Sequence, residues 1–419
     1  MNIPLHSRGK LSRAVWAWAT YDWANSAFAT SILVSFFPYL YRVYWFSGKD
    51  GNEVSFHLGV THSITALLVA FVSPVLGHLA DRQALHKRIL TAMIVTGSMS
   101  TLALGLLGRH ADLAALILFA IAVLSFALGN SLYDSLLVSI TEAEKINFVS
   151  GLGYALGYLG GGLLFGIQLL WLWADPKRLS DPAGCSRFIF FSTAAWWFFF
   201  SIPLMLYVKQ PPASPSSSSK NLFRNLKNLL ADRRLFLFLL AYFCYIDVVN
   251  TVIKMAFDFI QASGFKVSMG QTLVAILLIQ IIGFPAALIY ARLADRFGQG
   301  RMLGAGLGMY LLLLLMTPFG QSITFFAIMA AVIAFAQGGI QAVSRSVFAA
   351  AIPAESAAEY FAIYNIAGKF ASILGPFLVG FATSRIHPKS GFLALVPLLI
   401  LGIFLLKRAI QPQPLQGSN

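Results

Sequence analysis

Runs of about 20 apolar residues recur along the whole chain, and this feature limits the possible folds more than any other. A helix rises about 1.5 Å per residue, so such a run is long enough to cross the hydrocarbon core of a bilayer. The 419 residues are 58% hydrophobic and only 11% charged, a composition typical of polytopic membrane proteins. A membrane barrel would instead show short alternating segments. The sequence therefore predicts an all-α polytopic membrane protein.

We expect about twelve transmembrane helices, with ends defined to within a few residues. The predicted spans are 14–42, 56–80, 88–108, 112–140, 148–173, 187–208, 235–261, 271–293, 301–320, 322–350, 358–384 and 391–408. The segment 209–234 in the middle is Pro/Ser-rich and then basic, which is typical of a linker. Within it, Leu222, Leu226, Leu229 and Leu230 have the spacing of a short helix on the membrane surface. The predicted domains are thus an N-terminal six-helix bundle at 1–208, a linker at 209–234 and a C-terminal six-helix bundle at 235–419.

The net charge of +14 could indicate a nucleic-acid partner, but the basic residues lie at alternate connections between spans. This is the pattern that membrane orientation requires. The residues are Arg8, Lys10, Arg13, Arg82, Lys87, Arg88, those of segment 209–234, Arg292, Arg296, Arg301, Lys407 and Arg408; Lys177, Arg178 and Arg187 are the main exception. We therefore expect no nucleic-acid partner, a multi-pass protein of the plasma membrane (the inner membrane of a bacterium), and both termini in the cytoplasm.

The two halves carry similar motifs in the same order, which indicates an internal repeat of six plus six spans. Tyr21-Asp22-x-x-Asn25-Ser26 in the first half matches Asp247-x-x-Asn250-Thr251 in the second. The sequence GHLADR at 77–82 matches ARLADR at 291–296, and FALGN at 126–130 matches FAQGG at 335–339. Twelve spans, a middle linker and GHLADR after the second span together resemble the major facilitator superfamily. The opening YDWANSAFAT is similar to the branch that contains fungal vacuolar amino-acid effluxers and their bacterial relatives.

The GHLADR loop departs from the superfamily pattern where Ala84 and Leu85 replace a small turn residue and its neighbour, and the second copy is also partial. We interpret this motif as a conformational latch, because a carboxylate after the second span can meet a helix N-terminus or a basic side chain of the other half. The predicted latch residues are Gly77, Asp81, Arg82, Asp295 and Arg296. The alternative is that Asp81 and Arg82 form only a solvated turn.

Several predicted spans carry polar residues on one helix face. A charge at the bilayer centre costs about 2.5–3.5 kcal/mol, so these residues are expected to face protein or water. In the resembled fold, the first, fourth, seventh and tenth helices line a central cavity. The candidates for a substrate or proton pathway are Asp22, Asn25, Asn130, Asp134, Asp247, Asn250, Lys254, Arg345 and Lys369. Two alternatives are that buried acids and bases only neutralise one another, or that Arg345 serves as a gate.

Carboxylates and cations together suit a zwitterion such as an amino acid, and efflux is what the resemblance implies. An organic anion fits nearly as well, and a transporter of the same fold for a drug or a lysolipid is a further alternative.

The sequence has no Gly-x-x-x-x-Gly-Lys-Ser/Thr motif of an ATP-binding site, so we expect secondary transport without a cofactor. We also expect a monomer. A buried carboxylate favours its protonated form unless it is paired, so Asp22 or Asp134 is a candidate proton carrier. Uncoupled facilitated diffusion stays open. Since there is no His-Glu-x-x-His motif, neither a metal site nor an enzyme is expected.

Overall fold

The computed structural model describes residues 11–48, 51–213, 224–262, 264, 268–320, 322–371, 374–385 and 388–410. Helices form the regular structure of this described part, which confirms the predicted all-helical class. Ten of the helices found there are long and apolar enough to cross a membrane. Arg8, Lys10, Leu222 and the residues 214–221 of the predicted linker lie outside the described residues.

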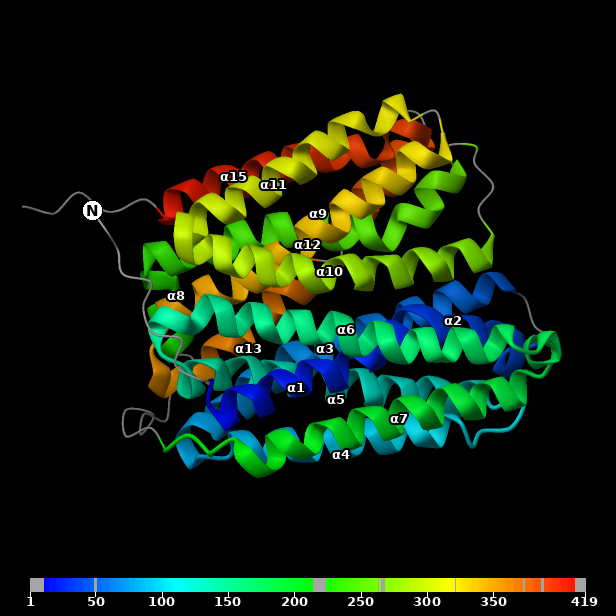
Figure 1. Ribbon diagram of the computed structural model, residues 1–419, viewed down its shortest axis with the longest axis horizontal. Helices are drawn as coiled ribbons and strands as arrows, with labels where there is room; N and C mark the ends of the chain where they lie inside the picture. The colour runs from blue at the N-terminus through cyan, green and yellow to red at the C-terminus, as the bar shows by residue number, and fades with distance from the viewer. Residues whose placement is uncertain are drawn as a thin grey trace, which may run out of the picture.

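The helices form two bundles joined by one short helix (Figure 1). The N-terminal bundle contains α1 (Arg13–Ala27), η1 (Phe28–Phe36), α2 (Phe37–Leu40), η2 (Tyr41–Trp45), α3 (Gly51–Gln83), α4 (His86–Leu104), α5 (Asp112–Ile140), α6 (Ile146–Trp173) and α7 (Pro182–Tyr207). The short helix α8 (Arg224–Ala231) lies in the predicted linker. The C-terminal bundle contains α9 (Arg233–Ala262), α10 (Met269–Phe297), α11 (Gln299–Met316), α12 (Ile323–Ala351), α13 (Ala357–Phe370), α14 (Leu374–Arg385), η8 (Pro388–Leu395) and α15 (Val396–Ile410).

Two of the predicted spans are less regular than the sequence suggests. The first runs from α1 into π-helical turns, where the Ser35 hydroxyl donates to the carbonyl of Thr30 at 2.8 Å. The span predicted at 358–384 contains α13, which ends at Phe370, and α14, which begins at Leu374, with residues 372–373 between them outside the described part. The predicted domain boundaries stay a prediction.

Apolar side chains cover the outside of the molecule as well as its core. Phe71 on α3 and Phe377 on α14 are 74% and 67% exposed, and many other large apolar side chains are exposed on the long helices. Such a surface is far more apolar than water tolerates, so it faces lipid. The protein is therefore a multi-pass integral membrane protein.

The two bundles meet along α6 with α10 and along α3 with α13. We call the end of the molecule that carries α8 the linker end; α1 begins and α15 ends there (Figure 1). Inside the N-terminal bundle, glycines of α6 allow α1 to approach closely. A Cβ at Gly160 would lie 2.4 Å from the carbonyl oxygen of Trp23, so any side chain there would push the helices apart.

Candidate functional site

A buried ionic cluster joins the two bundles near the linker end. Arg345 on α12 donates to Asp134 on α5 at 3.0 Å and to Asp22 on α1 at 3.3 Å. Arg345 is 2% exposed, and both carboxylates are buried. Because an unpaired buried charge is costly, the cation and the two anions depend on one another. We call these three residues the ionic cluster.

The remaining N–H groups of Arg345 are also used. Its Nε donates to the hydroxyl of Ser150 at 3.0 Å, and one terminal nitrogen donates to the Ser150 carbonyl at 2.8 Å. The guanidinium lies 4.2 Å from the ring centre of Tyr154 and 4.9 Å from that of Trp18. Aromatic faces stabilise a cation in this position. Arg345 is thus held by α6 as well as by the carboxylates.

Each carboxylate has a second partner besides Arg345. The hydroxyl of Tyr133, next to Asp134 on α5, donates to Asp22 at 2.8 Å. Asn365 on α13 donates to the other oxygen of Asp134 at 3.1 Å. The ionic cluster and its hydrogen-bond partners therefore come from α1, α5 and α6 of one bundle and from α12 and α13 of the other.

The position of the ionic cluster along the molecule decides what it can do. Arg345 lies six residues before Ala351, the last residue of α12. This corresponds to about 9 Å from the linker end of that helix. The ionic cluster therefore lies between the middle of the molecule and its linker end, and both of its ion pairs join the two bundles at this level.

Asp247, the counterpart of Asp22 in the second repeat, has different partners. Its carboxylate accepts the backbone N–H of Gly375 at 2.8 Å and the hydroxyl of Thr251 at 3.3 Å. Gly375 is the second residue of α14, so the buried carboxylate binds a helix N-terminus, where a negative charge is favoured. Asp247 thus binds the start of α14 inside its own bundle.

Lys254 and Lys369 lie on the far side of the ionic cluster from the linker end. Lys369 is twelve residues from the start of α13, or about 18 Å along the helix. Lys254 on α9 is exposed, and its charge interacts with that of Asp247 and with that of Lys369. His62 on α3 is near enough to interact electrostatically with both lysines. The two lysines, from α9 and α13, therefore make this region positive, and His62 from α3 lies close to both.

The predicted neutral residues form one direct pair. The amide of Asn25 on α1 donates to the side-chain oxygen of Asn130 on α5 at 2.7 Å. Asn250 on α9 is half-buried. The candidate residues thus fall into an ionic cluster, an amide pair in the N-terminal bundle, and a more open cationic region that includes Lys254 and Lys369.

Asp81, at the end of α3, lies against the other bundle. Its carboxylate accepts the backbone N–H groups of Ala358 at 3.2 Å and Glu359 at 3.0 Å, in the first turn of α13. His86 pairs with the same carboxylate at 2.8 Å. A Cβ at Gly77 would lie 2.8 Å from the Ala358 carbonyl oxygen, which explains why only glycine fits there. Asp81 is 2% exposed.

The linker adds further contacts at this place. Gln210 accepts from the N–H of Lys87 at 2.9 Å, and its amide lies 3.3 Å from His86. Asn225 on α8 donates to Glu359 at 2.7 Å. The linker therefore contacts α4 of the N-terminal bundle and α13 of the C-terminal bundle, beside the contact between α3 and α13.

The second copy of the loop motif contacts the opposite bundle less extensively. Asp295, at the end of α10, accepts the amide of Asn147 on α6 at 2.8 Å, and Gln299 donates to Asn147 at 2.6 Å. Asp295 is exposed, as are Arg82 and Arg296. The two loops thus occupy related positions, but only the carboxylate of Asp81 is buried against a helix N-terminus.

Sequence reasoning missed three residues of the site. Tyr133 and Ser150 are ordinary residues for a membrane helix, and only the structure places them on Asp22 and Arg345. A Cβ at Gly153 would lie 2.5 Å from Asp22 and 2.8 Å from Arg345, so this glycine makes room for their pairing. The glycine-rich stretch that contains it was a signal for close packing, but not for an ion pair. Within the described residues, no group of three His, Cys, Asp or Glu side chains is arranged to hold a metal.

Two comparisons of sequence give relatives of this chain. The model of the family described as "Vacuole effluxer Atg22 like" matches residues 41–412. The uncharacterized MFS-type transporter YxiO of Bacillus subtilis (strain 168) is 34% identical over 401 residues, or 93% of each chain. Autophagy-related protein 22 of Saccharomyces cerevisiae (strain YJM789) is 28% identical over 180 residues, or 40% of this chain and 34% of that protein.

Solved structures give the same fold. The human organic anion transporter MFSD10 matches with a TM-score of 0.71 at 17% identity, covering 94% of this chain and 99% of that one. The major facilitator superfamily transporter FucP, in its outward conformation, matches with a TM-score of 0.72 at 12% identity, covering 96% and 99%. At these identities the likeness establishes the major facilitator fold, with its two pseudo-symmetric six-helix bundles.

Proposed function

Because the chain belongs to the Atg22-like family of major facilitator transporters, we propose that it is a secondary active transporter that moves a small polar or zwitterionic solute by alternating access. The observation that carries this proposal is the ionic cluster. Arg345 joins Asp22 and Asp134 across the bundle interface, near one end only. Opening that end requires the bonds across the interface to break, and a solute bound between the bundles can provide competing partners.

Asp81 acts with the ionic cluster as a latch. Two backbone N–H groups of α13 bind its carboxylate, so rotation of the C-terminal bundle away from α3 breaks both bonds together. The negative charge of Asp81 is stabilised by the N-terminus of α13, and replacing Asp81 with asparagine removes that charge.

We expect Asp81→Asn to shift the population toward the state open at the linker end, measured by spin-label distances between α3 and α13. Asp295→Asn, at the exposed counterpart, is the matched control. Unchanged transport and unchanged populations in Asp81→Asn would refute the latch.

The linker end faces the cytoplasm in this proposal, and the membrane is the plasma membrane. Arg82, Arg88 and Arg301 are at this end of the molecule, as expected for cytoplasmic connections. Labelling of single cysteines at position 82 with a membrane-impermeant reagent tests the orientation: cells should be protected and inside-out vesicles labelled.

The substrate we favour is an amino acid. Its carboxylate can approach Lys254 and Lys369, and its ammonium group can compete with Arg345 for Asp22 or Asp134. An organic anion is the second candidate, because Lys254 and Lys369 both carry positive charge in that region. Proton coupling fits either substrate, since protonation of Asp22 or Asp134 would weaken their attraction for Arg345.

Counterflow in proteoliposomes separates these possibilities. Vesicles are loaded with one amino acid or one dicarboxylate, and uptake of the labelled compound is measured with and without a pH gradient. Saturable, stereoselective counterflow of an amino acid supports the proposal, and counterflow of the dicarboxylate alone supports the second candidate. Flux that does not respond to the pH gradient removes proton coupling. If Asp22→Asn keeps counterflow but loses pH-driven uptake, then Asp22 carries the proton.

A further inference from the structure

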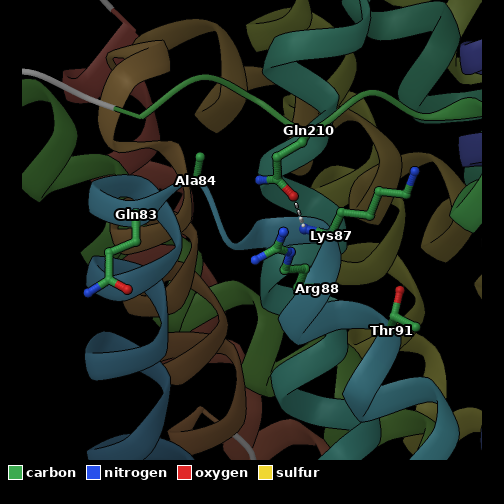
Figure 2. Close-up of a pocket in the computed structure, with 6 residues that line it drawn as sticks. All are labelled: Gln83, Ala84, Lys87, Arg88, Thr91 and Gln210. Atoms are coloured by element: carbon green, nitrogen blue, oxygen red, sulfur yellow. Dashed lines mark hydrogen bonds between the residues drawn. The ribbon is translucent and has the colours of Figure 1, made fainter.

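A cavity at the linker end lies at the turn from α3 to α4 and shares Lys87 and Gln210 with the linker contacts described above. It has a volume of about 690 Å³ and is lined by Gln83, Ala84, Lys87, Arg88, Thr91 and Gln210. Figure 2 shows these residues around the turn from α3 to α4, with Gln210 reaching the start of α4 from the segment after α7. The lining contains two cations, a hydroxyl and two amides, and no carboxylate. This set of groups suits an anion that accepts several hydrogen bonds.

The helix below the cavity is apolar and uncovered. Arg88, Ala92, Val95 and Met99 follow one another at i, i+4, i+7 and i+11, so they share one face of α4. Val95 is 39% exposed and Met99 is 50% exposed, in a protein whose outer surface faces lipid. A ligand held at Lys87 and Arg88 can therefore extend an apolar chain along α4 toward the middle of the membrane.

From the cations above and the apolar face below, we propose that this cavity binds the phosphate headgroup of an anionic phospholipid. The phosphate meets Lys87, Arg88 and the hydroxyl of Thr91, and an acyl chain lies on Val95 and Met99. Basic pockets at the ends of transmembrane helices recognise anionic headgroups in this way. The proposal depends on the membrane location of the chain and is independent of the transported solute.

The second repeat shows why the proposal is specific to this loop. Aligning GHLADR with ARLADR places Lys87 opposite Arg301 and Arg88 opposite Met302. The C-terminal bundle therefore keeps one cation of the pair and has an apolar side chain instead of the other. Arg301 and Lys407 are exposed cations at the same end of the molecule. The start of α11 and the end of α15 are close together there, because a Cβ at Gly300 would lie 2.8 Å from Ile410. They provide a control with the same change in net charge.

The test is lipid binding to the full-length protein in a neutral detergent, measured by native mass spectrometry and by the shift in apparent melting temperature. The probes are phosphatidylglycerol, phosphatidylcholine with the same acyl chains, and inorganic phosphate. We expect phosphatidylglycerol to bind and stabilise the unmodified protein. The double variant Lys87→Gln/Arg88→Gln should bind it at least about tenfold more weakly. Arg301→Gln/Lys407→Gln should bind it as the unmodified protein does.

Four outcomes would overturn the proposal. They are equal binding by the Lys87/Arg88 variant, an equal loss in the Arg301/Lys407 control, equal binding of phosphatidylcholine, or the same stabilisation by inorganic phosphate alone. The last would indicate a site for a free anion instead of a lipid. Should the double variant fail to fold, Arg88→Gln alone replaces it, because the exposed Arg88 side chain can lose its charge with little effect on packing.

Discussion

The two copies of the Asp-x-x-Asn motif have the same sequence pattern and different partners. Asp22 reaches across to Arg345 of the C-terminal bundle, whereas Asp247 binds Thr251 and the N-terminus of α14 within its own bundle. The first carboxylate therefore changes its surroundings when the bundles move, and the second does not. An internal repeat thus indicates where two residues lie without indicating what they bind.

The difference arises on the partner helices. Aligning FALGN at 126–130 with FAQGG at 335–339 places Leu136 of α5 opposite Arg345 of α12, and Val343 of α12 opposite Asp134 of α5. Leu136 is fully buried, so α5 has no cation at the position from which it could reach the second bundle. The ionic cluster exists in one orientation only, and it joins the bundles near one end of the molecule.

Removal of Arg345 should have the largest effect on this asymmetry. Arg345→Leu copies the residue at position 136 and leaves Asp22 and Asp134 buried without their cation. Breaking a buried ion pair in this way typically costs about 3–5 kcal/mol. We expect a loss of that order in the free energy of unfolding, measured in detergent micelles, together with loss of transport.

A compensated variant distinguishes charge imbalance from lost packing. Arg345→Leu combined with Asp22→Asn and Asp134→Asn carries no unpaired charge at this position. It should recover most of the stability without recovering transport, because apolar or neutral groups can replace a buried ion pair at little cost. If Arg345→Leu alone is as stable as the unmodified protein, the ionic cluster contributes no stability.

Matched asparagine substitutions compare the two carboxylates directly. Asp22→Asn leaves Arg345 with one carboxylate instead of two and should cost roughly 1–3 kcal/mol. It should also favour opening of the linker end, which distance measurements between α1 and α12 would detect. Asp247→Asn keeps an oxygen that can accept the N–H of Gly375, so the populations of the two states should not change. Similar shifts in both variants would contradict the difference between the repeats.

A change on α6 tests the same pairing without altering a charge. The added methyl group in Gly153→Ala would come within 3.0 Å of both Asp22 and Arg345, so these side chains must move apart. Overpacking of this kind costs about 1–3 kcal/mol. Gly166→Ala is the matched control, because its Cβ would meet only Leu277 at 3.7 Å. Gly153→Ala should reproduce the opening of Asp22→Asn, and normal behaviour in distance measurements would show that Gly153 does not position the pair.

Much of the fold could be predicted from the sequence, because long apolar runs leave a chain in lipid few options but helices. Asp22, Asp134 and Arg345 could be selected as candidate site residues, because a charged side chain is too costly to face lipid. Their pairing could not be predicted, because it depends on how two bundles rotate against each other. The bond from Asp247 to Gly375 could not be predicted either, because the two residues are 128 positions apart and meet only in three dimensions.

The smallest effect concerns the turns that follow the two loop motifs. Ala84 has a φ of 53°, and its counterpart Gly298 has a φ of 92°. A left-handed conformation costs a residue with a Cβ about 1–2 kcal/mol, whereas glycine adopts it freely. Glycine also makes the unfolded chain more flexible, which offsets part of the gain. Ala84→Gly should therefore stabilise the protein by about 0.5–1 kcal/mol, measured as a rise in the midpoint of denaturation.

Gly298→Ala should have the opposite effect. No atom lies within 4 Å of the Cβ that this change adds, so a loss of stability would come from backbone strain and not from a clash. A destabilised Ala84→Gly would mean that the methyl group of Ala84 matters more in this turn than its backbone conformation.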